Sequence, residues 1–460
     1  MAARSNDTID LSEFIDNGKM GRYQIWIIAI CFLTSFADGL DSQVTSIAIP
    51  FLAKDLHLQQ NQLGQVLSVS QLGALAGAFL FGTVADRWGR RPVIVACSLL
   101  FCLGTFATSY SNSLTSLCWL RLATGIGIGG AIPSFLALAA EYTPRRMRAV
   151  VTAIVLSAVP CGGIFAGFLG AVGLGPDAWI TDWRALFQLC GLISAVICML
   201  IVLKLPESLS FMVIKGKSTA KIARILQRFA QNETIVSPST GFTVHDEARS
   251  GKSIRSLFTR ERAAFTIIFG VMLLLTYAVL IGTLVWTPTL LRNAGMSVAQ
   301  SSLALSYHNI GAIIGNVTAG AMIDRFRYSS HSVIGLFFFG ATLAIVSVGY
   351  SVPHVWAVAI FSTLSGLFLA AGAASLYSMA VLTYPTHARS TGVGWGSALS
   401  RVGATMGPLV VGIFASANWA ISEVFLFVGL AVMLNVVLIA AMNFVSNDKI
   451  GRIKNAVVGS

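Results

Sequence analysis

Apolar runs of about 20 or more residues recur along the whole chain, separated by short polar stretches. A run of this length crosses the hydrocarbon core of a bilayer as a helix, because about 20 residues rising 1.5 Å each span about 30 Å. Composition agrees, since 55% of the 460 residues are hydrophobic, only 11% are charged and the mean hydropathy is +0.76. A soluble domain carries about 25% charged residues. The sequence therefore predicts an all-α, polytopic membrane protein.

Twelve transmembrane helices are expected, split six and six by one long polar interval. We place the spans at 23–48, 62–84, 91–110, 116–140, 149–173, 183–204, 264–290, 301–323, 331–350, 354–380, 391–415 and 420–444. The polar N-terminus predicts no cleaved signal peptide. The expected parts are an N-terminal tail (1–22), a six-helix bundle (23–204), a loop (205–263), a second six-helix bundle (264–444) and a C-terminal tail (445–460).

The positive charges are distributed unevenly between the two sides of this topology. Of the 31 Lys and Arg residues, 26 fall on the side that holds both termini and the long loop, whereas the other side holds only Lys54, Arg184 and Arg292. Cytoplasmic segments carry such an excess, so we expect both termini in the cytoplasm. The net charge of +12 thus follows from membrane topology, and no nucleic-acid partner is expected.

Two motifs of the first half recur in the second half, each about 240 residues further along the chain. GTVADRWGRR (82–91) is echoed by GAMIDRFR (320–327), with Asp86 and Asp324 separated by 238 residues. EYTPRRMR (141–148) is echoed by TYPTHAR (383–389), with Arg148 and Arg389 separated by 241 residues. Two pseudo-symmetric bundles in one chain are typical of secondary transporters that rock around a central site.

The first of these motifs resembles the helix 2–3 loop signature of the major facilitator superfamily, G-x-x-x-D-R-x-G-R-R. Gly82 permits a close helix approach and Gly89 a tight turn, whereas a loop that needed only positive charge would not require these glycines. The second copy keeps Asp-Arg but lacks the later Gly-Arg-Arg, which predicts a weaker latch. The expected gating residues are Gly82, Asp86, Arg87, Gly89, Arg90, Arg91, Asp324, Arg325 and Arg389.

Three charged residues are expected to couple transport to protons. Asp38 and Asp41, in FADGLDSQVT, share one helix face at i, i+3, where two carboxylates in a low dielectric cannot both ionise easily. One of them is therefore suited to hold and release a proton; the alternative is a pair of neutral packing acids or a position in an outer vestibule. Arg121, in WLRLATGIGIGG, is buried in the fourth span and serves either proton coupling or structure.

The D-G-x-D pattern around Asp38 resembles the aromatic acid:H⁺ symporter family of the same superfamily, as do FIDNGKMGRYQ, EYTP, WRALFQ and LPES. The resemblance extends over essentially the whole chain. It implies a monomeric, proton-coupled importer of a benzoate-like or hydroxybenzoate-like carboxylate in the bacterial inner membrane. By position, the resemblance carries functional roles to Asp38, Asp41, Asp86, Asp324, Arg389 and Arg401.

The candidate substrate site centres on Arg401, near the middle of the eleventh span. Its planar guanidinium matches a carboxylate with two parallel hydrogen bonds, although a standing ion pair with Asp38 or Asp41 is the alternative. His308 is a further candidate for contact with substrate or a proton. The remaining candidates are Asn309 beside it and the aromatic residues Phe36, Tyr307, Tyr377 and Trp395.

The sequence lacks the motifs that are typical of enzymes, ATP-driven transporters and metal-binding proteins. There is no phosphate-binding loop, no catalytic constellation, and no cluster of the seven cysteines or the histidines with metal-ligand spacing. We therefore expect no enzyme activity, cofactor or metal. The open alternatives are a carrier for another organic anion, a drug exporter, and a membrane sensor of aromatic acids that does not transport them.

Overall fold

Long helices dominate the computed structural model, which describes residues 8–18, 20–174, 180, 182–217, 219–228, 241–243, 257–259, 262–325, 330–417 and 419–458. The first six are α2 (Arg22–Asp55), α3 (Gln60–Trp88), α4 (Arg90–Thr108), α5 (Leu114–Glu141), α6 (Arg148–Gly173) and α7 (Trp183–Lys204). The second six are α10 (Ala263–Asn293), α11 (Val298–Arg325), α12 (Ser330–Tyr350), α13 (Val355–Thr383), α14 (Thr386–Ser416) and α15 (Ile421–Val458).

Within the described part of the chain, eleven of these helices are long and apolar enough to cross a membrane. The twelfth, α11, has 28 residues but is more polar, because its middle carries His308, Asn309 and Asn316. The all-α fold with twelve long helices agrees with the sequence-based prediction. The C-terminal helix differs in extent, since α15 continues to Val458, through the segment expected to be a tail.

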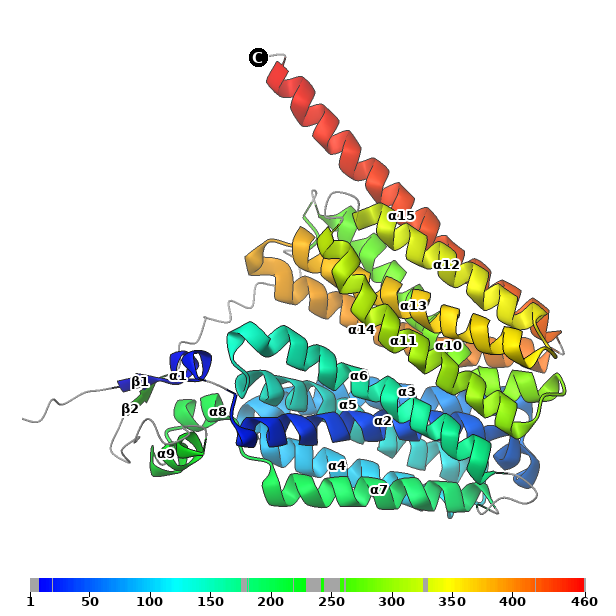
Figure 1. Ribbon diagram of the computed structural model, residues 1–460, viewed down its shortest axis with the longest axis horizontal. Coiled ribbons are helices and arrows are strands. Elements are labelled where there is room, and N and C mark those ends of the chain that lie inside the picture. Colours follow the sequence, from blue (N-terminus) through cyan, green and yellow to red (C-terminus); the bar gives the residue numbers. More distant parts are fainter. Residues whose placement is uncertain are drawn as a thin grey trace, which may run out of the picture.

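Short elements gather at one end of the long helices, which we call the tail end (Figure 1, left). Helices α1 (Leu11–Asn17), α8 (Leu209–Ile214) and α9 (Thr219–Gln227) lie there, together with a parallel pair of strands, β1 (Thr8–Asp10) and β2 (Gly241–Thr243). A 3₁₀ turn, Arg145–Met147, precedes α6. The opposite end, where α2 turns into α3, is called the far end.

Helices α2–α7 form one half of the molecule and α10–α15 the other, and glycines make equivalent contacts in both. A Cβ at Gly125 of α5 would collide with the Ser70 carbonyl of α3, and one at Gly366 of α13 would collide with the His308 carbonyl of α11. These two glycines are 241 residues apart, as are Arg148 and Arg389. Small residues permit this close approach of helices in a membrane.

The two halves meet toward the far end. The Ser46 hydroxyl of α2 donates a hydrogen bond of 2.6 Å to the Val285 carbonyl of α10, and Ser306 of α11 donates one of 3.0 Å to Ile164 of α6. Toward the tail end, by contrast, a Cβ at Gly82, Gly320 or Gly394 would meet no atom within 4 Å. Figure 1 shows α12 and α15 sloping away from α4 and α7 in this direction. The seam between the halves is thus closed at the far end.

Candidate functional site

A buried ion pair between Asp41 and Arg121 joins α2 to α5 in the interior of the first half. Arg121 Nη1 lies 3.0 Å from Asp41 Oδ2, and each residue is 1% exposed. Thr105 of α4 donates a hydrogen bond of 2.8 Å to Asp41 Oδ1. Both carboxylate oxygens therefore have donors, which is the condition for keeping a charge in so apolar a place.

Hydroxyl groups and one ring complete the surroundings of the guanidinium. Arg121 donates hydrogen bonds of 2.9 Å to the hydroxyls of Thr45 and Thr108, and its guanidinium lies 5.1 Å from the centroid of the Phe187 ring. Four helices, α2, α4, α5 and α7, thus converge on one charge. The sequence left Arg121 a role in proton coupling or in structure, and the structure shows that it forms an ion pair with Asp41.

Asp38 lies one turn nearer the tail end and is less constrained than Asp41. It is partly exposed, and the Ser42 hydroxyl donates it one long hydrogen bond of 3.4 Å. Its side chain lines a small pocket between α2, α4 and α5, and it interacts electrostatically with both Asp41 and Arg401. The two aspartates therefore have different environments although they share one helix face.

Arg401 of α14 is also partly exposed, and its guanidinium makes no hydrogen bond or ion pair within 4 Å with the side chains that the structure describes. It interacts electrostatically with Asp38 across the seam and with Tyr277 of α10. Tyr277 also interacts with Tyr377, whose hydroxyl donates a bond of 3.4 Å to Ser400. Among the described side chains, Arg401 is thus a cation without an ion pair that interacts with a carboxylate of the other half.

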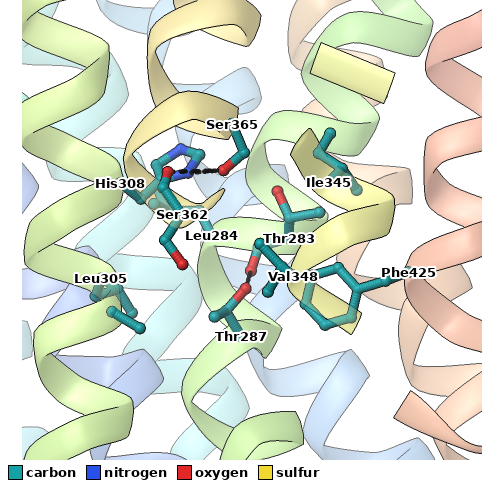
Figure 2. Close-up of a pocket in the computed structure, with 11 residues that line it drawn as sticks. Thr283, Leu284, Thr287, Leu305, His308, Ile345, Val348, Ser362, Ser365 and Phe425 are labelled. Atoms are coloured by element: carbon teal, nitrogen blue, oxygen red, sulfur yellow. Dashed lines mark hydrogen bonds between the residues drawn. The ribbon is translucent and has the colours of Figure 1, made fainter. Parts of the chain in front are cut away.

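His308 is placed inside the second half, in a small polar pocket drawn in Figure 2. Its Nδ1 lies 3.1 Å from the Ser365 hydroxyl, which itself donates to the Ser362 carbonyl. Because that hydroxyl hydrogen is used, Nδ1 of the histidine is the donor. The pocket has room for about one water molecule and is too small for an aromatic ring.

The His308 pocket occupies the position that the ion pair occupies in the first half. Ser362 and Ser365 follow Arg121 and Thr124 by 241 residues, the offset of the internal repeat. Serine hydroxyls thus replace the buried arginine and threonine. The two halves share an architecture, but at this position the described residues of the second half carry hydroxyls instead of an ion pair.

Asn309 and the aromatic candidates occupy different places along the seam and the bundles. The amide of Asn309 pairs with Gln43 across the seam, so in this conformation it joins the halves. Phe36 packs on Phe165 of α6, with ring centroids 5.8 Å apart. Trp395 packs edge-on against Phe258 at 5.4 Å. Tyr307 is partly buried on α11.

The glycine–arginine motif binds two acidic residues of its own half. The backbone amides of Arg90 and Arg91 donate to Glu207 Oε1 at 2.9 and 3.1 Å, and Arg90 Nη1 lies 2.6 Å from Glu141 Oε1. Glu207, in the LPES segment, was not among the predicted site residues. Its carboxylate sits at the N-terminus of α4, where a negative charge is favourable.

The remaining gating candidates divide into three groups. Gly89 has φ +107°, as the expected tight turn requires, but the close helix approach expected at Gly82 is absent from this conformation. Asp86 and Arg87 are exposed, and Arg389 is partly buried. The side chains of Asp324 and Arg325 lie outside the described residues.

Comparison with known proteins decides the family. The model of the Major Facilitator Superfamily matches residues 31–302 and 267–457. The chain belongs to the Major Facilitator Superfamily. The superfamily comprises transporters, which confirms the prediction of a membrane carrier and of no enzyme.

Several curated members of the superfamily are similar over nearly their full length. The 4-hydroxybenzoate transporter PcaK of Acinetobacter baylyi is 31% identical over 430 residues, covering 92% of both chains. The benzoate transport protein of the same organism is 28% identical and covers 95% of this chain and 93% of its own. The predicted resemblance to carriers of aromatic acids is thereby confirmed.

A solved member of the superfamily has the same fold. The crystal structure of the D-xylose-proton symporter matches with a TM-score of 0.70 at 16% identity, covering 91% of this chain and 97% of that one. Identity this low indicates a shared fold and carries no information about substrate.

Proposed function

We propose that this protein is a proton-coupled symporter that imports a small aromatic carboxylate into the bacterial cell. The relatives named for 4-hydroxybenzoate, benzoate and gallate support the class of substrate. The observation that carries the proposal is the Arg401 guanidinium, which has no ion pair among the described side chains and interacts electrostatically with Asp38 of the other half. No cofactor enters the proposed cycle.

The charge asymmetry of the sequence supports an orientation in the inner membrane. The tail end carries the basic motif loops and the long polar interval, so we assign it to the cytoplasm. With that orientation, the seam is closed toward the outside and open toward the cytoplasm. In this proposal the carrier is a monomer, and its two six-helix units, 23–204 and 264–444, rock against each other.

Arg401 binds the carboxylate of the substrate in this proposal. A guanidinium offers two parallel donors, and its attraction to a carboxylate is stronger in a water-poor cavity than in bulk water. Tyr277 and Tyr377 lie beside it and provide aromatic surface and hydroxyls for the ring and its substituents. A contact of substrate with Trp395, Phe36, Tyr307 or His308 requires movement from the positions described above.

Asp38 carries the proton, whereas Asp41 keeps its charge as the partner of Arg121. Protonating Asp41 would leave a buried guanidinium without a counter-ion, which costs several kcal/mol. Asp38 has one weak donor and partial exposure, so it exchanges a proton with water at lower cost. The two carboxylates of the coupling group thus differ in role, and the ion pair fixes the helix that presents Asp38.

The order of events follows from these roles. A proton from outside neutralises Asp38, which frees Arg401 to bind the incoming anion. The halves then rock, the gate formed by the Gly-Arg-Arg loop opens, and the proton and anion leave toward the cytoplasm. Asp38 and Arg401 then neutralise each other in the empty carrier during its return.

Uptake of labelled 4-hydroxybenzoate into proteoliposomes under an imposed pH gradient tests the proposal. We expect accumulation that collapses when the gradient is dissipated. Asp38→Asn should abolish accumulation but retain exchange of internal for external substrate. Uptake that is indifferent to the gradient, or full accumulation by Asp38→Asn, would sink the coupling role.

A parallel panel separates the competing functions. Thermal shift with benzoate, hydroxybenzoates, gallate and a set of cationic drugs reports which class binds. Stabilisation by drugs alone would identify an exporter, and stabilisation by aromatic acids without any counterflow would identify a sensor.

A further inference from the structure

The sequence places only three basic residues on the far side of the membrane topology, Lys54, Arg184 and Arg292. The structure brings all three to one place at the far end of the seam. Lys54 and Arg292 line a cavity of about 600 Å³ between the two halves, and Arg184 binds two acids of the same cavity. Membrane topology depletes this side of positive charge, so their convergence on one cavity is a distinctive feature.

The two acidic residues that the structure describes in this cavity share one arginine. Arg184 Nη1 lies 2.5 Å from Asp55 Oδ2 and 3.6 Å from Asp182 Oδ2. Trp183 Nε1 also donates a hydrogen bond of 3.2 Å to Asp55. With Lys54 and Arg292, the described side chains at the cavity are three basic and two acidic residues, which leaves one positive charge in excess.

Arg292 lacks a polar partner among the side chains that the structure describes. Its guanidinium lies over the Phe51 ring, with Cζ 4.5 Å from the ring centroid, and its buried Nη1 donates no hydrogen bond there. A guanidinium over an aromatic ring keeps its positive charge and can donate hydrogen bonds to an anion. Lys54 and His57 are exposed on the same cavity.

We propose that Lys54, Arg292, Phe51 and Trp183 form a far-end vestibule that captures an aromatic carboxylate before the gate opens. Lys54 and Arg292 attract the carboxylate, Phe51 contacts the aromatic ring, and the buried Trp183 holds Asp55 in place. The proposal rests on the proposed function and adds a second, peripheral site to the central one at Arg401. A cavity of this volume is the usual size for a small ligand.

A vestibule of this kind acts on capture and leaves the later steps unchanged. Basic side chains around a cleft raise the local concentration of an anion and its rate of association, and salt weakens the effect. The vestibule should therefore lower the KM for uptake from the far side while Vmax is unaffected. Movement of substrate from the tail side does not pass through the capture step and should not depend on it.

Kinetics of 4-hydroxybenzoate uptake test the vestibule. For Arg292→Gln and Lys54→Gln we expect KM to rise about tenfold and about threefold, with Vmax unchanged and efflux at the wild-type rate. Arg292→Lys, which keeps the charge, is the matched control, and its KM should stay close to that of the wild type. An unchanged KM in both glutamine variants overturns the proposal. If Arg292→Gln does not reach the membrane, Lys54→Gln gives the same test, because the exposed Lys54 can be replaced without disturbing the fold.

A second measurement does not require transport. In a His57→Cys variant, 4-hydroxybenzoate in the outer solution should slow labelling by a membrane-impermeant maleimide, whereas acetate and phenol at equal concentration should not. Adding Arg292→Gln should remove the protection. Protection that persists without any uptake would overturn the transport function and keep the vestibule, whereas uptake without protection would overturn the vestibule.

Discussion

Gln43 of α2 and Asn309 of α11 exchange two hydrogen bonds across the seam between the halves. Asn309 Nδ2 donates to Gln43 Oε1 at 2.7 Å, and Gln43 Nε2 donates to Asn309 Oδ1 at 3.2 Å. Both residues are nearly fully buried, with Gln43 1% exposed and Asn309 3% exposed. A Cβ at Gly163 of α6 would collide with both amides, so the pair is enclosed by three helices.

Replacing Asn309 by Leu should increase the fraction of molecules in which the seam is open at the far end. The change leaves the buried Gln43 amide without its partner, which costs about 1–3 kcal/mol in the closed seam and shifts the equilibrium about 5- to 150-fold. Labelling of a Ser306→Cys reporter with an impermeant thiol reagent measures the opening. Asn316→Leu, an exposed position on the same helix, is the control, and equal labelling in both variants would contradict the prediction.

Asp41→Asn should destabilise the protein far more than Ser42→Ala. Removing one member of a buried ion pair leaves the charge of Arg121 uncompensated, at a cost of about 3–5 kcal/mol. Thermal unfolding in detergent measures the difference. The double variant Asp41→Asn/Arg121→Gln should lose less than the two single variants added together, and strict additivity would show that the pair is not coupled.

Arg401→Lys should bind 4-hydroxybenzoate more weakly than the wild type, and Arg401→Gln should not bind it measurably. Lysine keeps the charge but loses the planar pair of donors that matches a carboxylate. Isothermal titration with the purified carrier measures both, and we expect a loss of about tenfold for lysine. Neither variant should change the melting temperature much, because the guanidinium makes no ion pair with the described side chains.

Gly125→Ala and Gly82→Ala should separate packing from gating. The first places a methyl group against the Ser70 carbonyl, an overpacking that costs about 1–3 kcal/mol of unfolding free energy. The second meets open space in this conformation, so it should leave stability unchanged. If Gly82 closes against another helix when the carrier faces outward, the same variant slows uptake. Loss of stability in Gly82→Ala would be inconsistent with the open tail end.

The periodic apolar runs predict the fold well, because span length and the positive-inside asymmetry are properties of single segments. They also place Arg121 inside a span, where a buried charge needs a partner or a function. They do not determine which aspartate that partner is, since Asp38 and Asp41 share a face and the choice depends on Thr105 from a third helix. The pairing of Asn309 with Gln43 likewise depends on how two distant segments meet.

The site residue that the sequence did not indicate, Glu207, also depends on a contact between distant segments. Glu207 lies 116 residues beyond Arg91, and only the fold brings its carboxylate to the start of α4. His308 is the converse case, because its depth along α11 suggested a cavity position while packing against α13 encloses it. Depth in the membrane follows from sequence position, whereas the direction of a side chain depends on neighbouring helices.

The electrostatic interaction of Asp38 with Arg401 determines which part of the proton-motive force the proposed carrier can use. On the proposed cycle, the empty carrier holds one negative and one positive charge between its halves, and the loaded carrier holds a neutral acid, the arginine and one anion. Both moving forms are electroneutral, so a membrane voltage, worth about 2.3 kcal/mol per unit charge at 100 mV, does no work on either step. Such a carrier would draw on the pH difference alone and would keep importing in a depolarised cell.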